Sequence, residues 1–389
     1  MKILMLTDSL DTGGAETHIS TLANELHGRS PSAILGAILG GRNVPFSTNF
    51  SEKPLEIILA SAGGRIAQSL ADQGFKHILL PTPSRSLLCI FKTFRIIDRE
   101  RPSIVHAHTR RTALAAFLPC KIYRIPLAVT FHARFSMSFP KRLLTVAGDV
   151  SAAVSEDIRE HIECELKIPK NRIKIIKNGV KIPKKTQISS KNHQKIVFVS
   201  RLDADCSLGA DLLCSIAQRL TQKYPDIEII LVGGGEEYPR IAQKCREINQ
   251  KLNHELIISV GAQTNVEKYL CGASLFVGVS RAALEAMAQG LPVILLGNEG
   301  FLGLLDEKNL PLAKRTNFTC RGFGREVDAD VLFAEIQAFF SLDDAEKTRI
   351  STLCRDTVKK DYSAHKMAQD TLLTYAPLFS APPQKNLDS

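Results

Sequence analysis

The chain has 389 residues, 44% of them hydrophobic, and it contains no tryptophan. Its 50 Lys and Arg residues outnumber its 40 Asp and Glu residues, which gives a formal net charge of +10. This length and hydrophobicity exclude a disordered chain and favour a globular protein of two domains or so.

The cysteines and the apolar runs indicate in which cellular compartment the protein is expected. Nine cysteines occur without a C-x-x-C pair or a regular spacing, which is typical of reduced thiols and disfavours structural zinc and a disulfide framework. No apolar run approaches the roughly 18 residues of a membrane-spanning helix, and the first one meets Asp8 too early for a signal peptide. We therefore expect a cytoplasmic protein, and a peripheral position on the inner face of the plasma membrane stays open.

Short apolar runs alternate with helical patterns along the chain, which predicts parallel sheets covered by helices. The segment from Gly28 to Pro54 is too long for an ordinary connection, so a functional loop or an extra hairpin is expected there. The predicted strands are 2–7, 55–60, 77–80, 103–106, 126–131, 150–154 and 173–176 in the first half, then 195–200, 227–232, 256–260, 274–278 and 292–296 in the second.

A polar segment, 181–195, has five lysines and no acidic residue and is interpreted as a linker. It separates two predicted doubly wound domains, 1–180 and 196–362. A helix over 363–380 is expected to return to the first domain, and 381–389 is expected to be a disordered tail. Sheets of this kind bind ligands at the carboxyl ends of their strands, so the ligand is expected in a cleft between the domains.

The positive charge belongs to the first half. Residues 1–190 hold 27 basic and 15 acidic side chains, a net of +12, whereas 191–389 hold 23 and 25, a net of −2. The basic excess fits an anionic lipid surface, a phosphorylated substrate or a plain solvated face. Nucleic acid is disfavoured because aromatic residues are not interleaved with the cations. The candidate acceptor or membrane patch consists of Arg110, Arg111, Arg134, Lys141 and Arg142.

Gly13 and Gly14 follow the first predicted strand and precede an amphipathic helix. A Gly-Gly turn at a helix start lets an anion approach bare backbone N–H groups. The turn lacks a dinucleotide-binding fingerprint and the Lys of a phosphate-binding loop, so an ordinary strand-to-helix turn is the alternative.

Polar residues also follow strands in the second half. Arg201 follows one strand, Gly233 follows another, and Ser280 is the predicted N-cap of a helix that contains Glu285. An arginine at a strand end can clamp a phosphate, and a glutamate pointing into a cleft can accept two ribose hydroxyls. The alternatives are a surface ion pair for Arg201 and a helix-face charge for Glu285.

Eight short motifs occur in a fixed order along nearly the whole chain. They are Gly13-Gly14-Ala15-Glu16, Ile104-Val105-His106-Ala107-His108, Thr130-Phe131-His132, Val154-Ser155-Glu156, Asn178-Gly179-Val180, Ser200-Arg201-Leu202, Val232-Gly233-Gly234-Gly235 and Leu284-Glu285-Ala286-Met287-Ala288-Gln289-Gly290-Leu291-Pro292-Val293-Ile294. Each motif is short, but the ordered series resembles glycosyltransferase family 4 and is specific to that family.

The resemblance implies an α/β protein of GT-B fold, with two Rossmann-like doubly wound domains facing a central cleft. It implies a retaining glycosyltransferase that moves a sugar from a UDP- or GDP-sugar to a lipid-linked or polysaccharide acceptor in cell-envelope or exopolysaccharide synthesis. It implies no metal and no other cofactor. Two alternatives remain: a catalytically weak accessory subunit that binds a partner enzyme, and a GT-B sugar-nucleotide epimerase.

The resemblance also implies roles for individual residues. His132 would hydrogen-bond the reacting sugar, Arg201 the diphosphate and Glu285 the ribose, and these three are the predicted catalytic set. The predicted donor-binding set is Gly13, Gly14, Arg201, Gly233, Gly234, Arg281 and Glu285.

Two departures from the family pattern concern the donor phosphates. The family usually has a Lys five or six positions after the Arg, where this chain has Cys206 and Ser207. The first acid of the family's paired-glutamate motif is also missing, which leaves Glu285 alone. Losing one charged hydrogen bond of this kind costs about 1.5–3 kcal/mol. We hypothesise that Arg281 supplies the missing positive charge.

Overall fold

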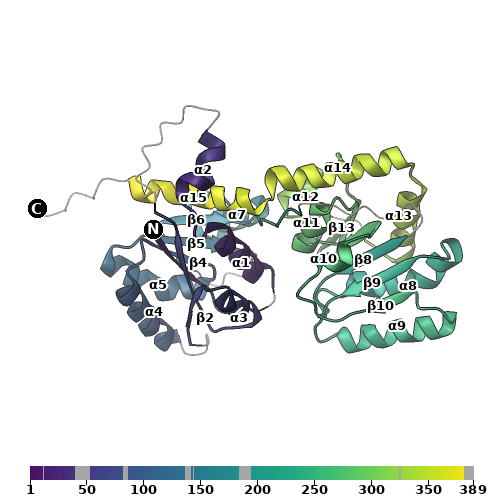
Figure 1. Cartoon of the computed structure of the whole chain (residues 1–389), viewed down its shortest axis with the longest axis horizontal. Coiled ribbons are helices and arrows are strands. Elements are labelled where there is room, and N and C mark those ends of the chain that lie inside the picture. Colours follow the sequence, from purple (N-terminus) through teal and green to yellow (C-terminus); the bar gives the residue numbers. More distant parts are fainter. Residues whose placement is uncertain are drawn as a thin grey trace, which may run out of the picture. The chain divides into compact units, whose positions relative to one another are not determined.

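The computed structural model describes residues 1–11, 13–39, 53–81, 86–135, 142, 144–183, 194–323 and 326–380. The chain divides into two compact units (Figure 1). Unit 1 comprises Met1–Gly179 and Ala364–Ser389, and unit 2 comprises Val180–Ser363. Among the described residues, no helix has both the length and the apolar character needed to cross a bilayer.

Unit 1 contains a seven-stranded parallel sheet in the order β3-β2-β1-β4-β5-β6-β7. Its strands are β1 (Lys2–Leu6), β2 (Glu56–Ser61), β3 (Lys76–Leu79), β4 (Ile104–Ala107), β5 (Leu127–Phe131), β6 (Val150–Ala153) and β7 (Ile173–Ile175). Its helices are α1 (Gly14–Leu26), α2 (Pro31–Leu39), α3 (Arg65–Asp72), α4 (Ser86–Glu100), α5 (Arg110–Tyr123), α7 (Glu156–Leu166) and α15 (Ala364–Ser380), with a 3-10 turn at Lys170–Arg172.

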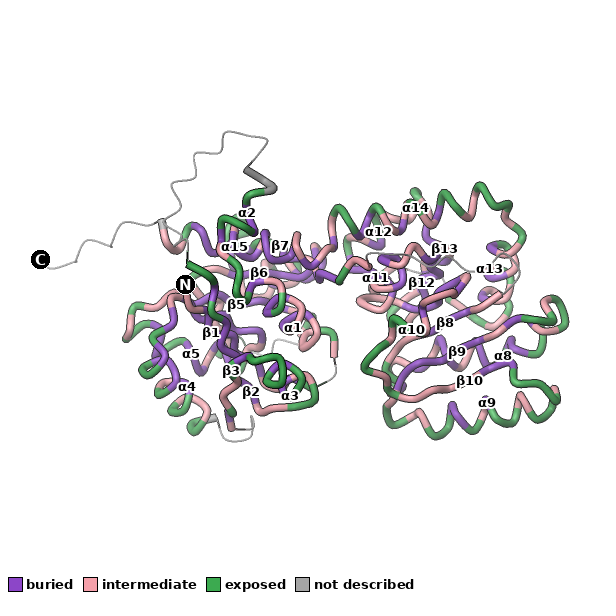
Figure 2. Tube along the Cα trace, in the orientation of Figure 1, coloured by how far each residue is buried: buried purple, intermediate pink, exposed green. Residues whose placement is uncertain are grey.

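Both faces of this sheet are buried, which explains why its strands are unbroken apolar runs. Successive side chains of a strand point to opposite faces. Ile3 of β1 therefore packs in a core with residues of α1 and α15, whereas Leu4 packs in a second core with residues of α4 and α5. Figure 2 shows the buried strands beneath helices that are exposed on their outer sides.

Unit 2 contains a six-stranded sheet in the order β10-β9-β8-β11-β12-β13. Alternation buries Ile196 and Val197 in separate cores on its two faces. Its strands are β8 (Lys195–Val199), β9 (Glu228–Val232), β10 (Ile257–Ser259), β11 (Leu275–Gly278), β12 (Val293–Gly297) and β13 (Gly300–Leu304). Its helices are α8 (Leu208–Lys223), α9 (Tyr238–Leu252), α10 (Glu267–Leu270), α11 (Ser280–Ala288), α12 (Leu310–Arg315), α13 (Ala329–Ser341) and α14 (Asp344–Asp361).

The predicted strands are confirmed to within two residues at each end, and two local expectations need correction. A further strand, β13, pairs antiparallel with β12 and was not predicted. The segment from Gly28 to Pro54 begins neither as a loop nor as a hairpin, because Pro31–Leu39 forms helix α2 with a proline at its first position. Residues 40–52 of that segment, residues 184–193 of the predicted linker and the tail 381–389 lie outside the described residues.

Candidate functional site

The sheet of unit 1 has a switch point between β1 and β4, where its strand order reverses. Parallel sheets bind ligands in the crevice at the carboxyl ends of the strands that flank such a point. Asp8 lies just beyond β1, and Thr109, which caps α5, lies just beyond β4. The Thr109 hydroxyl donates to Asp8 Oδ1 at 3.1 Å, so the two connections are tied together at this edge.

Gly13 and Gly14 begin α1 at the same edge. The Gly13 carbonyl accepts hydrogen bonds from the backbone N–H of Thr17 at 3.0 Å and from its hydroxyl at 2.6 Å. A Cβ on Gly14 would meet no atom within 4 Å, so the space beside this backbone is open to a ligand. Contact of either glycine with a donor diphosphate stays a prediction.

Three histidines from three separate elements meet in unit 1. His108 follows β4 and His132 follows β5, and a hydrogen bond of 3.2 Å joins His108 Nδ1 to His132 Nε2. His18 of α1 places its ring centroid 4.8 Å from that of His132, edge to face. Asn178 holds His18 through a 2.9 Å contact between Asn178 Oδ1 and His18 Nδ1. Three of the sequence motifs, together with His18 of α1, therefore converge on one place.

A fourth histidine lies behind this group. His106 is buried, with Nε2 at 2.7 Å from the Thr130 hydroxyl and Nδ1 at 2.7 Å from the Tyr375 hydroxyl of α15. Burial lowers the pKa of His106 to about 3. Burial, together with neighbouring imidazoles, also holds the pKa of His108 and of His132 well below 6.5. These imidazoles are therefore neutral at pH 7. Both ring nitrogens of His106 are already engaged, so His108 and His132 are the ones suited to hydrogen-bonding sugar hydroxyls rather than to holding an anion.

The three histidines that meet at this edge of the sheet could also hold a metal ion. His18, His108 and His132 each offer a ligand atom, and these atoms lie within 4.8 Å of one another. A neutral imidazole is the form that binds transition metals, and three histidines form a known type of zinc site. The expectation that transfer requires no metal stays a prediction.

A small pocket lies beside Asp8, between the N-terminal ends of α4 and α5. Its volume is about 130 Å³, and its wall is largely apolar, with Arg111 as its cation. The lining residues are Thr7, Asp8, Leu80, Pro81, Cys89, Ile90, Arg111, Thr112, Leu114 and Ala115. It lies at the switch point and is the candidate acceptor pocket of unit 1.

In unit 2, Arg201 lies in the loop after β8. Its side chain is 58% exposed and donates to Asp203 Oδ2 at 2.8 Å. Its Nη2 atom lies 3.6 Å from the sulfur of Cys206, which with Ser207 occupies the two positions where the family usually has its lysine. The surface ion pair is therefore present, and the exposed guanidinium also faces solvent, where a phosphate could reach it.

The glycines after β9 lie where a larger side chain would clash with neighbouring segments of unit 2. A Cβ on Gly233 would lie 1.8 Å from the Ser200 carbonyl oxygen, and one on Gly234 would lie 2.9 Å from Ala262 Cβ. The Gly234 carbonyl accepts from the Leu202 N–H at 2.9 Å. Gly233 therefore lets the loop that carries Arg201 pack closely, and Gly234 does the same for the segment at Ala262. Contact of these glycines with a donor stays a prediction.

Helix α11 carries Arg281 and Glu285 beyond β11, which neighbours β8 at the switch point of this sheet. Arg281 Nε donates to Glu285 Oε1 at 3.0 Å, and burial lowers the pKa of the arginine. The expectation for Ser280 is wrong: the N-cap is Val279, and no side chain caps the helix. Ser280 instead adopts a left-handed φ of 59°, stabilised as its N–H donates to the Phe318 carbonyl at 2.7 Å.

The predicted basic patch is divided among different environments. Arg110 stacks over the Phe135 ring at 4.1 Å, and Arg134 lies 3.4 Å from the buried carboxylate of Asp157. Arg111 lines the pocket beside Asp8, and Arg142 is exposed. Lys141 lies outside the described residues. Two of the four described cations are therefore already engaged within the protein.

Residue-by-residue reasoning selected only His132 from the histidine group. His18, His108 and Asn178 were missed as site residues, although two of them lie within the recognised motifs. The available signal was the position of His108 and His132 at the ends of successive predicted strands, because the carboxyl ends of parallel strands meet at one edge of a sheet.

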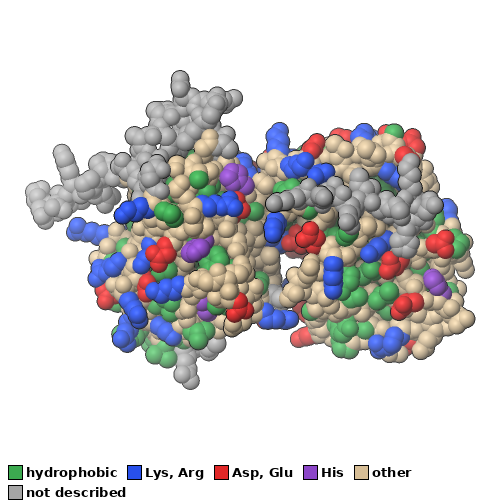
Figure 3. Space-filling view, in the orientation of Figure 1, with side chains coloured by type: hydrophobic (Ala, Val, Ile, Leu, Met, Phe, Trp, Pro, Cys, Tyr) green, Lys and Arg blue, Asp and Glu red, His purple; other side chains and the backbone are tan. Residues whose placement is uncertain are grey.

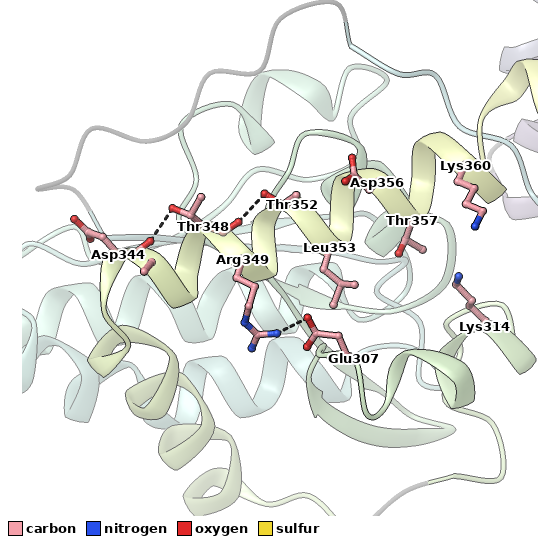
Figure 4. A pocket seen from close by; sticks show the side chains of 11 residues that line it. Glu307, Lys314, Asp344, Thr348, Arg349, Thr352, Leu353, Asp356, Thr357 and Lys360 are labelled. Carbon is pink, nitrogen blue, oxygen red and sulfur yellow. Dashed lines mark hydrogen bonds and ion pairs between the residues drawn. The ribbon is translucent and has the colours of Figure 1, made fainter.

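A larger open groove of about 970 Å³ runs along α14 and includes Glu307 and Lys314 (Figure 4). Within the groove Arg349 pairs with Glu307, and Lys314 pairs at 2.8 Å with Asp361, which does not line the groove. None of the predicted site residues lines it.

Two families match the chain in succession, Glycosyltransferase Family 4 over residues 12–182 and Glycosyl transferases group 1 over 193–317. An uncharacterised glycosyltransferase of Methanocaldococcus jannaschii is 28% identical over 246 residues, which are 54% of this chain and 60% of that protein. One component of the human phosphatidylinositol N-acetylglucosaminyltransferase is 27% identical over 252 residues, 60% of this chain and 51% of that protein. The chain thus spans about half to three fifths of the length of these relatives.

Solved structures match the whole fold. A glycosyltransferase from Rickettsia africae has a TM-score of 0.71 at 19% identity and covers 98% of this chain and 99% of its own. Anabaena HepE in complex with UDP has a TM-score of 0.67 at 17% identity and covers 97% of this chain and 100% of its own. These likenesses show two Rossmann-like units of the GT-B type.

Proposed function

Because the chain belongs to glycosyltransferase family 4 and has a GT-B fold, we propose that it is a retaining glycosyltransferase that uses a UDP- or GDP-sugar. The observation that carries the proposal is the placement of polar groups at the switch points of both sheets. The histidine group and the open backbone at Gly14 lie in unit 1, and Arg201 and the Arg281–Glu285 pair lie in unit 2.

In the proposed reaction the acceptor hydroxyl attacks the anomeric carbon from the side on which the diphosphate leaves. A bond forms between the acceptor oxygen and that carbon, the bond to the phosphate oxygen breaks, and this oxygen takes the acceptor's proton. No protein nucleophile is needed. The exposed guanidinium of Arg201 would stabilise the charge growing on the diphosphate, and His132 would orient the sugar by hydrogen bonds.

No group in this scheme requires a metal, so we propose metal-independent transfer with no cofactor besides the donor. Neutral His108 and His132 can bond to sugar hydroxyls without a metal, since a neutral imidazole both donates and accepts a hydrogen bond.

For the acceptor we propose a lipid-linked or growing glycan of the cell envelope or an exopolysaccharide, handled at the cytoplasmic face of the membrane. The largely apolar pocket beside Asp8, with Arg111 as its cation, suits a group that is both apolar and anionic. The human relative, whose name includes phosphatidylinositol, supports the lipid-linked class.

Isothermal titration of the full chain with a panel of UDP- and GDP-sugars tests the proposal. We expect one donor to bind clearly better than the others, and Arg201→Ala to weaken it by about tenfold or more, as expected for a charged hydrogen bond. Arg219→Ala, which removes an exposed arginine on α8 that pairs with Asp330, is the matched control. A chain that binds no donor would instead fit an accessory subunit. Isomerisation of the donor in the absence of acceptor would fit an epimerase.

A further inference from the structure

Two neighbouring helices of unit 1, α4 and α5, expose large apolar side chains to solvent. Six of the nine large apolar residues that are exposed in the described chain lie on them. They are Leu87, Leu88 and Phe91 on α4, at 81%, 50% and 61% exposure, and Phe117, Leu118 and Ile122 on α5, at 41%, 57% and 55%. A soluble protein rarely gathers apolar side chains in this way unless the surface binds something.

These side chains lie on the outer sides of helices that pack against each other. The rings of Phe94 on α4 and Tyr123 on α5 have centroids 5.2 Å apart. Ile97 of α4 and Ala116 of α5 are buried in the same core against the sheet, so the exposed residues occupy the opposite sides of both helices. Figure 1 shows the two helices next to each other. We call this surface the α4–α5 face.

Cations are interleaved with the apolar residues of this face. Lys92 and Arg95 are exposed on α4, and the Arg95 guanidinium lies 5.9 Å from the centroid of the Phe91 ring. Lys121 on α5 lies 5.9 Å from the centroid of the Phe117 ring. Figure 3 shows Lys and Arg side chains gathered at the lower left of unit 1, where Figure 1 places α4.

The acidic residues near this face are few and engaged. Helix α5 contains none. Asp98 of α4 pairs with Arg101 at 2.5 Å, and Asp149 pairs with Lys121 at 3.0 Å. Apolar side chains with a surplus of cations complement the surface of an anionic bilayer, because the apolar groups enter the acyl region while lysine and arginine contact the headgroups. A protein-binding surface would not need this excess of one sign.

We propose that the α4–α5 face seats unit 1 on an anionic lipid bilayer, with Leu88, Phe91 and Leu118 inserted and Lys92, Arg95 and Lys121 at the headgroups. The N-terminal ends of the same two helices line the pocket beside Asp8, so a seated face would bring a lipid-linked acceptor next to that pocket. This last step, unlike the seating itself, rests on the proposed function.

The absence of tryptophan allows a direct test with the full chain. Phe91→Trp provides a single fluorophore on the face, and Leu312→Trp, at an exposed position on α12 of unit 2, provides the control. With vesicles of phosphatidylcholine and phosphatidylglycerol, we expect the Phe91→Trp emission to shift to the blue and to be quenched by brominated acyl chains, and the control emission to stay unchanged. Equal behaviour of the two variants would overturn the proposal.

Sedimentation with the same vesicles tests whether the apolar side chains and the cations of the α4–α5 face both contribute to binding. We expect Phe91→Asp and Leu118→Asp each to weaken vesicle binding about tenfold or more, and Lys92→Ala about fivefold. Leu312→Asp makes the same change of charge in unit 2 and should have no effect. Binding should fall strongly at about 1 M salt, where charges are screened within roughly 3 Å. The proposal is overturned if the variants bind vesicles as tightly as the original chain, or if the chain binds no vesicle. Because neither donor nor acceptor is present, this outcome is independent of transferase activity.

Discussion

Arg281 and Glu285, one turn apart on α11, form an ion pair in which Arg281 Nε donates to Glu285 Oε1 at 3.0 Å. The arginine side chain is only 12% exposed, whereas the glutamate is 33% exposed. Arg281 can therefore act on a donor in two ways. It can contact the diphosphate directly, as hypothesised from the sequence, or it can hold Glu285 in position for the ribose.

A double-mutant cycle on donor affinity separates these two roles. We expect Arg281→Ala to weaken donor binding by about 1.5–3 kcal/mol, the usual value of a hydrogen bond to a charged group. If Arg281 contacts the diphosphate, the same loss persists in a Glu285→Gln background; if it only positions Glu285, the loss disappears there. Unchanged affinity in the single variant Arg281→Ala would contradict both roles.

Cys206 offers a gain-of-function test of the phosphate site. Its sulfur lies 3.6 Å from Arg201 Nη2, at one of the two positions where the family usually has a lysine. We expect Cys206→Lys to tighten donor binding about tenfold, because a second cation would face the diphosphate. Cys206→Ser, which adds no charge, is the control. Titration that finds equal affinities for the two variants would show that the diphosphate does not bind beside Arg201.

The buried His106 predicts how stability depends on pH. Its pKa is about 3 in the folded chain and about 6.5 when unfolded, so the unfolded chain takes up the proton first as the pH falls. The stability that neutral His106 contributes is therefore complete above about pH 6.5 and is lost as the pH falls from there toward about 3. One such group changes the free energy of unfolding by about 1.4 kcal/mol per pH unit.

Urea unfolding at a series of pH values between about 6.5 and 4 measures this slope. We expect His106→Gln to be less steep than the original chain by about 1.4 kcal/mol per pH unit. His254→Gln, at an exposed position in unit 2, should leave the slope unchanged. A slope that is the same in all three proteins would contradict the buried, neutral state of His106.

The three-histidine group predicts the response to metals. A chelator should leave transfer unchanged, because no step of the proposed reaction uses a metal. Added Zn²⁺ should inhibit, because it would bind the atoms that His18, His108 and His132 place within 4.8 Å of one another. We expect His18→Gln to lower the sensitivity to Zn²⁺ relative to its own activity, and His254→Gln to leave it unchanged. Loss of activity on chelation would contradict metal-independent transfer.

Strand positions were predictable because each parallel strand is an apolar run buried on both faces. Strand β13 was not, because Gly300 and Gly303 interrupt its apolar pattern, and its alternating burial is that of an antiparallel edge strand. Helix α2 was not predicted because its proline, Pro31, is also typical of a turn. Proline is nevertheless favourable at the first position of a helix.

The site was predictable only in part. Motif order located Arg201 and His132 at the ends of strands and Glu285 in the helix after a strand. It could not show that the side chains of Arg281 and Glu285 pair, or that Gly233 accommodates the loop of Arg201, since these depend on distances in the folded chain. His18 and Asn178 are 160 positions apart, and only the folded chain joins them.

Transfer to a lipid-phosphate acceptor, followed by mass spectrometry of the lipid product, tests the central claim most directly. With the donor that binds best, the full chain should add one sugar with its anomeric configuration retained. The variant with Arg201→Ala and Glu285→Gln together should lose this activity, while Leu312→Asp, which lies outside every motif, should keep it. Full transfer by the double variant would contradict the account, as would an inverted anomeric centre in the product.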